Sequence, residues 1–522
     1  MPLRQDGAMP EPRSAAQHDF RLYHSNSLEI LAGILARVLR EPAPGQSLLA
    51  PEIVLIPQVA MRRWLQATLA AEHGVAANIE FLTPGEFVGQ ALAANLPAEP
   101  GDDELDLDTL HWHLYAALGD RALLQQPALA QIAAHVDGPD PLRAWALAGE
   151  LANVFNKYQA WRREWLLRWE AGADPDDPQA ILWRRVASGR SHRARRIQQY
   201  LDRFEPLDGP LPQGLPPRLS AFATLNVSPD VLRVIATQAR VGALHLFVPS
   251  PVADYWGDLQ RLRRGEPRGE SGENPLLQRW GAAGADFMQL VGGYELVHAS
   301  AEFNVHADPG EGGGALRGSL LRRLQADVYH RRHAPAAPLR ENIDRKDPSL
   351  QLHACHTRLR ELQVLADQLR GLFDDPRFDP PLQPREVAVL APDIDPYLPY
   401  LEPVFGRRGE PEAIPYALAD ASPLANEPLA GVFLRLLGLP VSRFGLHEVL
   451  DLLASPAVAE ANGLDAPALD RLRVWLEAAG ARWGIDAAHR ARLDAPEDDA
   501  YTWAFALDRL LLGHASGSDA PI

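Results

Sequence analysis

The sequence predicts an α/β fold in which helical segments interrupt parallel sheets, and three observations support this prediction. Strand and helix patterns alternate over residues 19–100, they alternate again in "LSAFATLNVSPDVLRVIATQARVGALHLFVP" (residues 219–249), and the long segment between shows helical periodicity only. Strands that alternate with helices are typical of a parallel sheet. The chain has 522 residues, 46% of them hydrophobic, so we expect about three or four domains.

The first α/β domain is predicted to begin after residues 1–18, which we expect to form a disordered tail. "FRLYHSNSLEILAGILARVLR" (residues 20–40) has the pattern of a strand, a turn at Ser25–Ser27 with helix-capping residues, and an amphipathic helix. "EIVLIPQVAMRRWLQATLA" (residues 52–70) predicts a second strand, a turn after Pro57 and a second helix. One face of that helix carries Met61, Trp64, Leu65 and Leu69, which we expect to pack on the sheet.

A helical insertion is predicted over residues 101–205. It opens in an acidic segment, "AEPGDDELDLDTLHWH" (residues 98–113), which we expect to be a loop, and a proline-rich stretch, "EPLDGPLPQGLPPR", closes it. Residues 206–345 then supply the remainder of the first α/β domain.

A second α/β domain is predicted over residues 346–440. Its expected strands are "LQLHACH", "EVAVLAP" and "IPYALAD", and "RLRELQVLADQLRGLF" is the helix after the first of them. From residue 441 to 522 the pattern is helical again, as at the start of a second insertion.

Charge and lysine content narrow the functional classes. The formal net charge of −17 argues against indiscriminate wrapping of nucleic acid, although a basic tunnel inside an acidic protein remains compatible with it. Lys157 follows Asn156 and Lys346 follows Arg345, and the chain has no other lysine. A phosphate loop needs a lysine directly after glycine, so the turn after Pro57 is a strand-to-helix turn without Walker A residues.

Metal, nuclease and membrane functions find little support. The single cysteine, Cys355, excludes a disulfide or a four-cysteine zinc site within this chain. "HACH", "HWH" and "HRRH" lack further ligands nearby, so we predict no metal site. Asp344 and Asp347 flank Lys346, but a linker turn explains them better than a nuclease centre. The first residues lack an apolar signal core, and no apolar run could span a bilayer, so we expect a cytoplasmic protein.

Arginines provide the candidate nucleic-acid contacts. Arg62 and Arg63 lie opposite the apolar face of their helix, where they would contact phosphates or base edges, or simply face solvent. In "WRREWLLRW", helical spacing predicts that Trp161, Trp165 and Trp169 share a core face, while Arg162 and Arg163 point elsewhere. The densest basic cluster suits phosphate tracking, although such a run is usually only solvated, and comprises Arg184, Arg185, Arg190, Arg193, Arg195 and Arg196.

Several segments, in family order, resemble RecC, the gamma subunit of exodeoxyribonuclease V. They include "LYHSNSLEIL", "MRRWLQATLAAEHGVAANIEF", "RREWLLRWEAG", "HLFVPSPVADYWGD", "NPLLQRWGAAGADF", "HACHTRLRELQVL", "IPYALADAS", "RWGIDAAHR" and "TWAFALDRLLLG". RecC is similar in architecture to a superfamily 1 helicase whose P-loop-like sheets have lost their Walker motifs. The resemblance implies 1A-like, 1B-like, 2A-like and truncated 2B-like domains at the boundaries given above.

The resemblance also implies a function: a noncatalytic subunit that channels double-stranded DNA ends and single strands, while RecB-like and RecD-like partners use ATP and Mg. The family scans single strands for Chi, a short sequence that switches the complex from degradation to recombination. The matching positions, mostly of other residue types than expected, are Pro57, Val59, Arg63, Thr83, Gly89, Asn153, Asn156, Lys157, Arg162 and Arg193. A self-sufficient helicase or nuclease and a scaffold without DNA contact are the alternatives.

Overall fold

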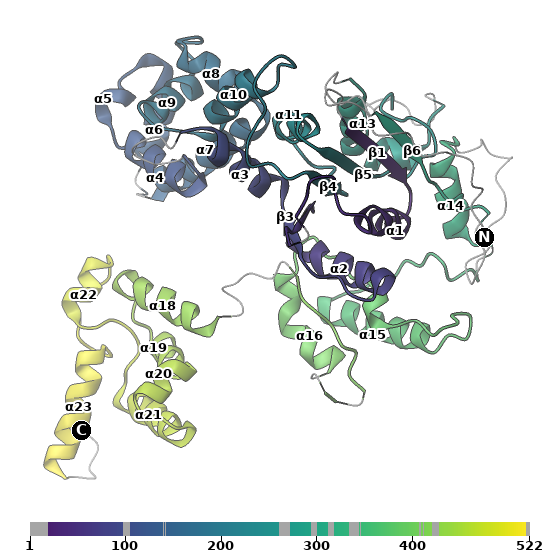
Figure 1. Cartoon of the computed structure of the whole chain (residues 1–522). Coiled ribbons are helices and arrows are strands. Elements are labelled where there is room, and N and C mark those ends of the chain that lie inside the picture. Colours follow the sequence, from purple (N-terminus) through teal and green to yellow (C-terminus); the bar gives the residue numbers. More distant parts are fainter. Residues whose placement is uncertain are drawn as a thin grey trace. The chain divides into compact units, whose positions relative to one another are not determined.

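The computed structural model describes residues 19–47, 49–97, 105–138, 140, 142–259, 272–293, 300–311, 318–333, 344, 346–406, 409–410, 412–419 and 427–517. The chain divides into two compact units, Met1–Gln351 and Leu352–Ile522, and each is described by itself (Figure 1).

The first unit contains a sheet of six strands, and every neighbouring pair is parallel. The order is β3-β2-β4-β5-β1-β6, and Phe20 of β1 pairs with Leu244 of β5. The predicted parallel α/β fold is therefore confirmed for this unit. The strands are β1 (Asp19–Ser25), β2 (Glu52–Leu55), β3 (Ile79–Leu82), β4 (Arg218–Phe222), β5 (Ala243–Pro249) and β6 (Ala301–Asn304).

Helices cover both faces of this sheet. Successive residues of a strand point to opposite faces, and here the apolar side chains on each face need a helical layer to bury them. Tyr23 belongs to the core beneath α1 (Leu28–Leu39) and α2 (Val59–His73), whereas Leu22 faces the opposite core. That second core is covered by α3 (Pro84–Asn95), α10 (Arg193–Phe204), α11 (Pro229–Ala236), α12 (Pro275–Trp280) and α13 (Ala282–Gly293), and the chain continues through η2 (Thr237–Arg240) and α14 (Leu320–Tyr329).

The predicted strand, turn and helix of residues 52–70 form as expected, with one exception. Leu65 and Leu69 are fully buried and Met61 is partly buried. Trp64 is 36% exposed at the edge of the core, where its ring lies 6.2 Å from that of Phe222.

Between β3 and β4 the chain forms a helical block with its own core (Figure 1). The expected loop over residues 98–113 is corrected: residues 98–104 lie outside the described part, and α4 occupies 107–113. Asp106 caps α4 by accepting a hydrogen bond from the backbone N–H of Thr109. Besides α10, the block comprises α4 (Leu107–Leu118), α5 (Arg121–Leu124), η1 (Pro127–Leu129), α6 (Ala130–Val136), α7 (Leu142–Trp161), α8 (Arg163–Glu170) and α9 (Pro178–Ala187).

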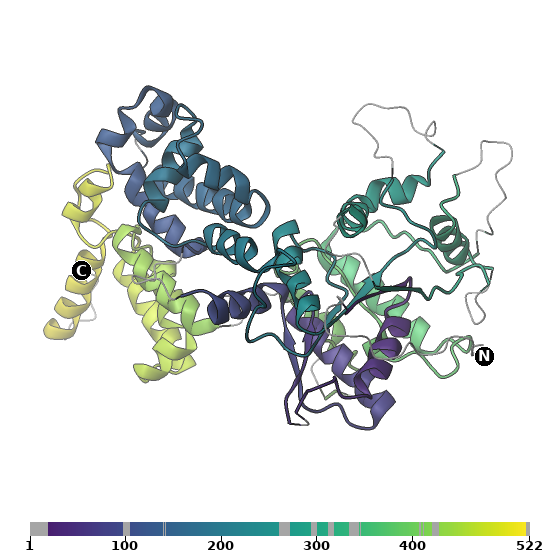
Figure 2. The same ribbon diagram turned by 45° about the horizontal axis from the view of Figure 1, so that its top comes forward.

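The second unit contains two groups of helices. α15 (Arg358–Phe373) coincides with the predicted helix and packs on α16 (Leu398–Phe405), preceded by η4 (Pro384–Glu386) and η5 (Asp395–Tyr397). Residues 427–517 are helical in both views, green to yellow (Figures 1 and 2). They form α18 (Pro428–Gly438), η6 (Leu439–Val441), α19 (Leu446–Leu453), α20 (Pro456–Ala461), α21 (Ala466–Ala479), α22 (Ala487–Arg492) and α23 (Trp503–Ser516).

The three strands predicted in the second α/β domain do not form within its described residues. "LQLHACH", "EVAVLAP" and residues 414–419 of "IPYALAD" contain no strand, and Asp420 lies outside the described part. Leu352 is 100% exposed and Leu390 is 94% exposed, so these apolar residues cover no core. Alternating apolar residues become a strand only beside a partner strand that accepts their backbone hydrogen bonds, and the described residues of this unit offer none.

Helix α18 exposes a row of large apolar side chains, which leads to a prediction about association. Leu429, Phe433 and Leu437 recur every four residues and are at least 60% exposed. Exposed apolar patches favour self-association. We expect the double substitution Phe433→Glu and Leu437→Lys to shift the chain toward its monomer mass in light scattering, with an unchanged melting temperature. Ala461→Glu, on exposed α20, is the matched control; a wild-type chain that is already monomeric at high concentration would contradict the prediction.

Candidate nucleic-acid interface

The candidate interface is built on α7, whose two faces differ. Ala148, Ala152 and Phe155 are buried against the core of the helical block. The opposite face carries Glu150, Asn153, Asn156 and Lys157, all exposed. Residues at intervals of three and four share one face of a helix, so these polar side chains form a single row, called here the α7 row.

α7 ends at a one-residue break in the helix, called here the α7–α8 corner. Arg162 leaves helical geometry (φ −141°, ψ 38°), so α7 stops at Trp161 and α8 starts at Arg163. The corner is fixed by Gln159, which donates to the Leu105 carbonyl (2.8 Å) and accepts from the Arg193 N–H (3.1 Å). These two hydrogen bonds hold the last turn of α7, which carries Lys157, in place.

A buried ion pair ties this corner to the helices on the sheet. The Arg163 guanidinium, only 5% exposed, lies 3.2 Å from the carboxylate of Asp230 in α11. Burial raises the pKa of Asp230, against the opposing effect of Arg163 and Arg233. Arg233 also pairs with Glu205, just after α10. These charges join α8, α10 and α11 and so hold the helical block against the sheet-covering helices.

The corner exposes two of the three tryptophans that the sequence assigned to a common core face. Trp169 is buried, and its indole N–H donates to Asp174 (3.0 Å). Trp161 is 44% exposed and Trp165 is 42% exposed, so the core assignment is wrong for both. The helix break at Arg162 accounts for Trp161, because it rotates this residue out of the phase of α8. Trp165 lies within α8, four residues before the buried Trp169, and is nevertheless 42% exposed. Arg162 itself is exposed, and its guanidinium carbon lies 5.5 Å from the Trp165 ring centre.

The predicted basic cluster of α9 and α10 is largely engaged within the helical block. Arg184 donates to the carbonyls of Trp169 and Ala173, and Arg190 donates to that of Val186. Arg185 lies 3.5 Å from the carboxylate of Asp120 and is 55% exposed. The cluster thus serves first to close loops and helix ends.

Glu170 is the centre of a buried network at the start of α10. Its carboxylate accepts from the Trp183 indole (2.9 Å) and from Arg195 (2.6 Å), and it lies 2.7 Å from His192. Burial acts to raise the Glu170 pKa, but these partners outweigh it and lower the pKa to about 2. Arg193 and Arg196, the first helical turn of α10, are both half-buried.

The remaining predicted residues lie on α2 and α3. Pro57, Val59 and Arg63 are exposed where β2 leads into α2, and Val59 is 71% exposed. Arg62 is exposed as well, with its guanidinium carbon 5.9 Å from the Phe81 ring centre, and it lines a hollow of about 400 Å³ beside β3.

On α3, Thr83 and Glu86 form a capping box in which each side chain contacts the other's backbone N–H. Gly89 is exposed, with open space where a side chain would project. The predicted residues therefore fall into two groups: Asn153, Asn156, Lys157, Arg162 and Arg193 around α7, and the others on α2 and α3. α10 packs against α3 and so links the elements that carry the two groups.

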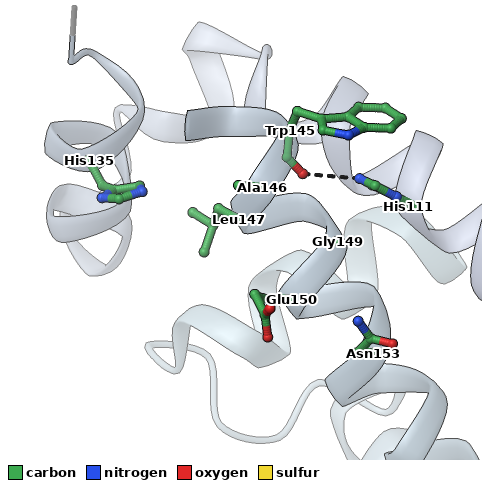
Figure 3. A pocket seen from close by; sticks show the side chains of 8 residues that line it. All are labelled: His111, His135, Trp145, Ala146, Leu147, Gly149, Glu150 and Asn153. Atoms are coloured by element: carbon green, nitrogen blue, oxygen red, sulfur yellow. Dashed lines mark hydrogen bonds between the residues drawn. The ribbon is translucent and has the colours of Figure 1, made fainter. Parts of the chain in front are cut away.

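A cavity of about 410 Å³ opens beside the first half of the α7 row (Figure 3). His111 and His135 approach it from α4 and α6, and Trp145, Glu150 and Asn153 line it from α7. The His111 ring lies 3.9 Å from the ring of Trp145, and its Nε2 is 3.0 Å from the Trp145 carbonyl. Sequence reasoning missed this cavity, because the pairing of α4 with α7 is not visible in local patterns.

Two negative observations complete the description. Within the described residues, no three His, Cys, Asp or Glu side chains converge as metal ligands would. No helix in the same residues combines the length and hydropathy needed to cross a bilayer.

Comparison with known proteins gives the family. The model of "RecC, N-terminal domain" matches residues 20–331, and that of "RecBCD enzyme subunit RecC fourth domain" matches residues 426–522. Proteins named RecBCD enzyme subunit RecC from Escherichia coli and Mycolicibacterium smegmatis are each 29% identical, over 95% and 96% of this chain. The chain covers 48% and 46% of these relatives, so it spans about half their length. The first of these family models covers more than half of the chain, and the residues that it matches form the parallel α/β unit with its helical insertion. This chain therefore belongs to the RecC family.

Proposed function

We propose that this chain is a noncatalytic, DNA-binding subunit of a RecBCD-type helicase-nuclease. It guides duplex ends and separated single strands during double-strand break repair by recombination, in the cytoplasm. The observation that carries the proposal is the α7 row, where Lys157 and two asparagines lead to Arg162 on a rigid corner. A single strand offers phosphates, which lysine and arginine bind, and base edges, to which asparagine amides can hydrogen-bond. RecB-like and RecD-like subunits are the proposed partners.

ATP hydrolysis and Mg binding are assigned to those partners. In a nucleotide-binding protein the helix after a sheet strand receives phosphate at its N-terminus. Here the Ser27 side chain caps α1 by accepting from the Ile30 N–H, and its hydroxyl donates to the Glu29 carboxylate at 2.7 Å. A carboxylate in the first turn of α1 would repel a phosphate group, which supports a chain without ATPase activity.

Reading of the usual Chi octamer is not expected. Discrimination between bases depends on the donors and acceptors presented to them. Gly89 presents no side chain, the Thr83 hydroxyl is engaged in its capping box, and Lys157 offers donors only. In a complex reconstituted with RecB-like and RecD-like partners, DNA products should be the same with and without the usual octamer. DNA products that change when the usual octamer is present would contradict this part of the proposal.

Removing the cations of the α7 row should weaken binding of single-stranded DNA. We expect Lys157→Ala and Arg162→Ala each to raise the Kd of the full chain for an oligothymidine about three- to tenfold at low salt. Each change should also reduce the slope of log Kd against log salt by about 0.7, because one phosphate contact is lost. Fluorescence anisotropy over a salt series measures both quantities.

Lys346→Ala is the matched control, since Lys346 is exposed and is the other lysine of the chain. It should leave the Kd and the salt slope unchanged. Equal losses in all three variants would mean that charge in general, and not the α7 row, determines binding. If the wild-type chain fails to bind single strands, the proposed DNA contact is overturned.

A further inference from the structure

The corner between α7 and α8 presents aromatic rings together with cations. Trp161 and Trp165 are 44% and 42% exposed, and they flank Arg162 in the chain. Arg168 follows one turn after Trp165, with its side chain 59% exposed and paired with Asp174. Trp165 therefore lies between Arg162 at the corner and Arg168 on α8, and Lys157 lies one turn before Trp161 on α7.

The Trp165 ring is held from its inner side. It contacts Tyr158 edge-on at 5.5 Å and lies 6.4 Å from Trp169, which is anchored in the core of the block. The other tryptophans of this core, Trp169 and Trp183, are buried, and both indole N–H groups are hydrogen-bonded. A ring that is fixed on one side and open on the other can stack on a ligand without first losing much conformational freedom.

The surrounding charges indicate the ligand. Lys157 and Arg162 supply positive charge at the corner, whereas Arg168 and Asp174 pair with each other; Glu164 is a further exposed acid of α8. The exposed leucine and phenylalanine row of α18 has no such alternation of rings and cations. Rings that alternate with cations suit an unpaired nucleic-acid strand, whose bases stack while its phosphates pair with lysine and arginine.

We propose that Trp161 and Trp165 form a base-stacking platform for single-stranded DNA at the α7–α8 corner. This inference rests on the proposed function and deepens it by naming the groups of the strand that are held there. Lys157 and Arg162 contact the backbone, and the two indoles contact the faces of bases. Stacking is tolerant of base identity, so the platform supplies affinity and leaves sequence discrimination to polar neighbours.

The test compares two strands of equal length, an oligothymidine and a strand of abasic nucleotides, in anisotropy titrations of the full chain. The wild-type chain should bind the oligothymidine more tightly. Trp165→Ala and Trp161→Ala should each raise the Kd for the oligothymidine about 5- to 100-fold and leave the Kd for the abasic strand unchanged. The salt slope should stay constant, because no phosphate contact is removed. Trp165→Phe should restore most of the loss.

Trp280→Ala is the matched control because Trp280 is 79% exposed on α12, away from the α7–α8 corner in the chain. If wild-type binding is retained but the two corner variants bind oligothymidine normally, the platform is overturned and the proposed function stands. The same holds if they lose affinity equally for both strands, or if Trp165→Phe is as weak as Trp165→Ala. If the wild-type chain binds neither strand, the proposed function itself fails, and the platform fails with it.

Discussion

Replacing Asp230 by Asn is expected to lower the free energy of unfolding of the first unit by about 3–5 kcal/mol. The substitution leaves the Arg163 guanidinium, 5% exposed, without the carboxylate 3.2 Å away. The Arg163 Nε and Nη1 atoms are already buried without a hydrogen-bond partner, so the cation has no nearby substitute. An unpaired buried charge costs far more than the pair contributes, because water no longer solvates it.

A double-mutant cycle separates this cost from simple loss of contact. Arg163→Met should destabilise less than Asp230→Asn, because Asp230 keeps Arg233 at 3.8 Å. The double variant should be more stable than Asp230→Asn alone, since the orphaned cation is gone. Urea titration gives the free energies, and hydrogen exchange of α8 and α11 peptides assigns them to this junction. A double variant as unstable as the sum of the singles would show that the two charges are not coupled.

The parts of the fold that local patterns determine were predicted well. The turn after β1 and helix α1 follow from the capping residues at Ser25–Ser27, and α15 follows from its apolar spacing. The strands expected near Leu352 and Leu390 failed for a nonlocal reason: a strand requires a neighbour, and sequence alternation does not tell whether one is present. α4 was missed for a local reason: the acidic composition of residues 98–113 suggested a loop, and the capping role of Asp106 was not considered.

The candidate site shows the same division between local and nonlocal information. The family resemblance singled out Asn153, Asn156 and Lys157, and the structure places them on the exposed face of α7. Sequence reasoning could not foresee the break at Arg162, where neither proline nor glycine marks the end of α7, and so Trp161 was assigned to the core face of α8. Nor could it reveal that Glu170, far from the basic cluster in sequence, engages Arg195. Whether an arginine is available to DNA depends on partners of this kind.

A second large effect is expected on acidification, at the centre of the sheet. His245 of β5 is 2% exposed, and its Nδ1 lies 3.1 Å from the Tyr23 hydroxyl of β1. Burial, aided by the positive charges of Arg21 and Arg218, lowers the His245 pKa from 6.5 to about 4, while Asp19 opposes the shift. The unfolded chain therefore takes up this proton near pH 6.5, whereas the folded chain resists it until about pH 4.

Proton linkage determines how the free energy of unfolding changes with pH: it falls on acidification wherever the unfolded state binds more protons than the folded state. The contribution of His245 is fully present above pH 6.5 and is lost as the pH falls from 6.5 to about 4, a loss of about 3 kcal/mol. The lowered pKa values of His24 and His306 act in the same direction. Glu170, lowered from 4.5 to about 2, adds its loss only at more acidic pH.

The double substitution Tyr23→Phe and His245→Phe should flatten this profile. It removes the titrating ring and its hydroxyl partner together, so no polar group is left orphaned and stability at pH 7 should change little. Hydrogen exchange of β1 and β5 peptides between pH 7 and pH 4, corrected for intrinsic rates, reports the loss where it arises. His447→Gln, at an exposed histidine on α19, should retain the wild-type profile.

Because β1 and β5 are neighbours inside the sheet, with β4 and β6 beyond them, protonation of His245 should open the sheet from its middle. An unchanged loss in the double variant would place the acid-sensitive group elsewhere.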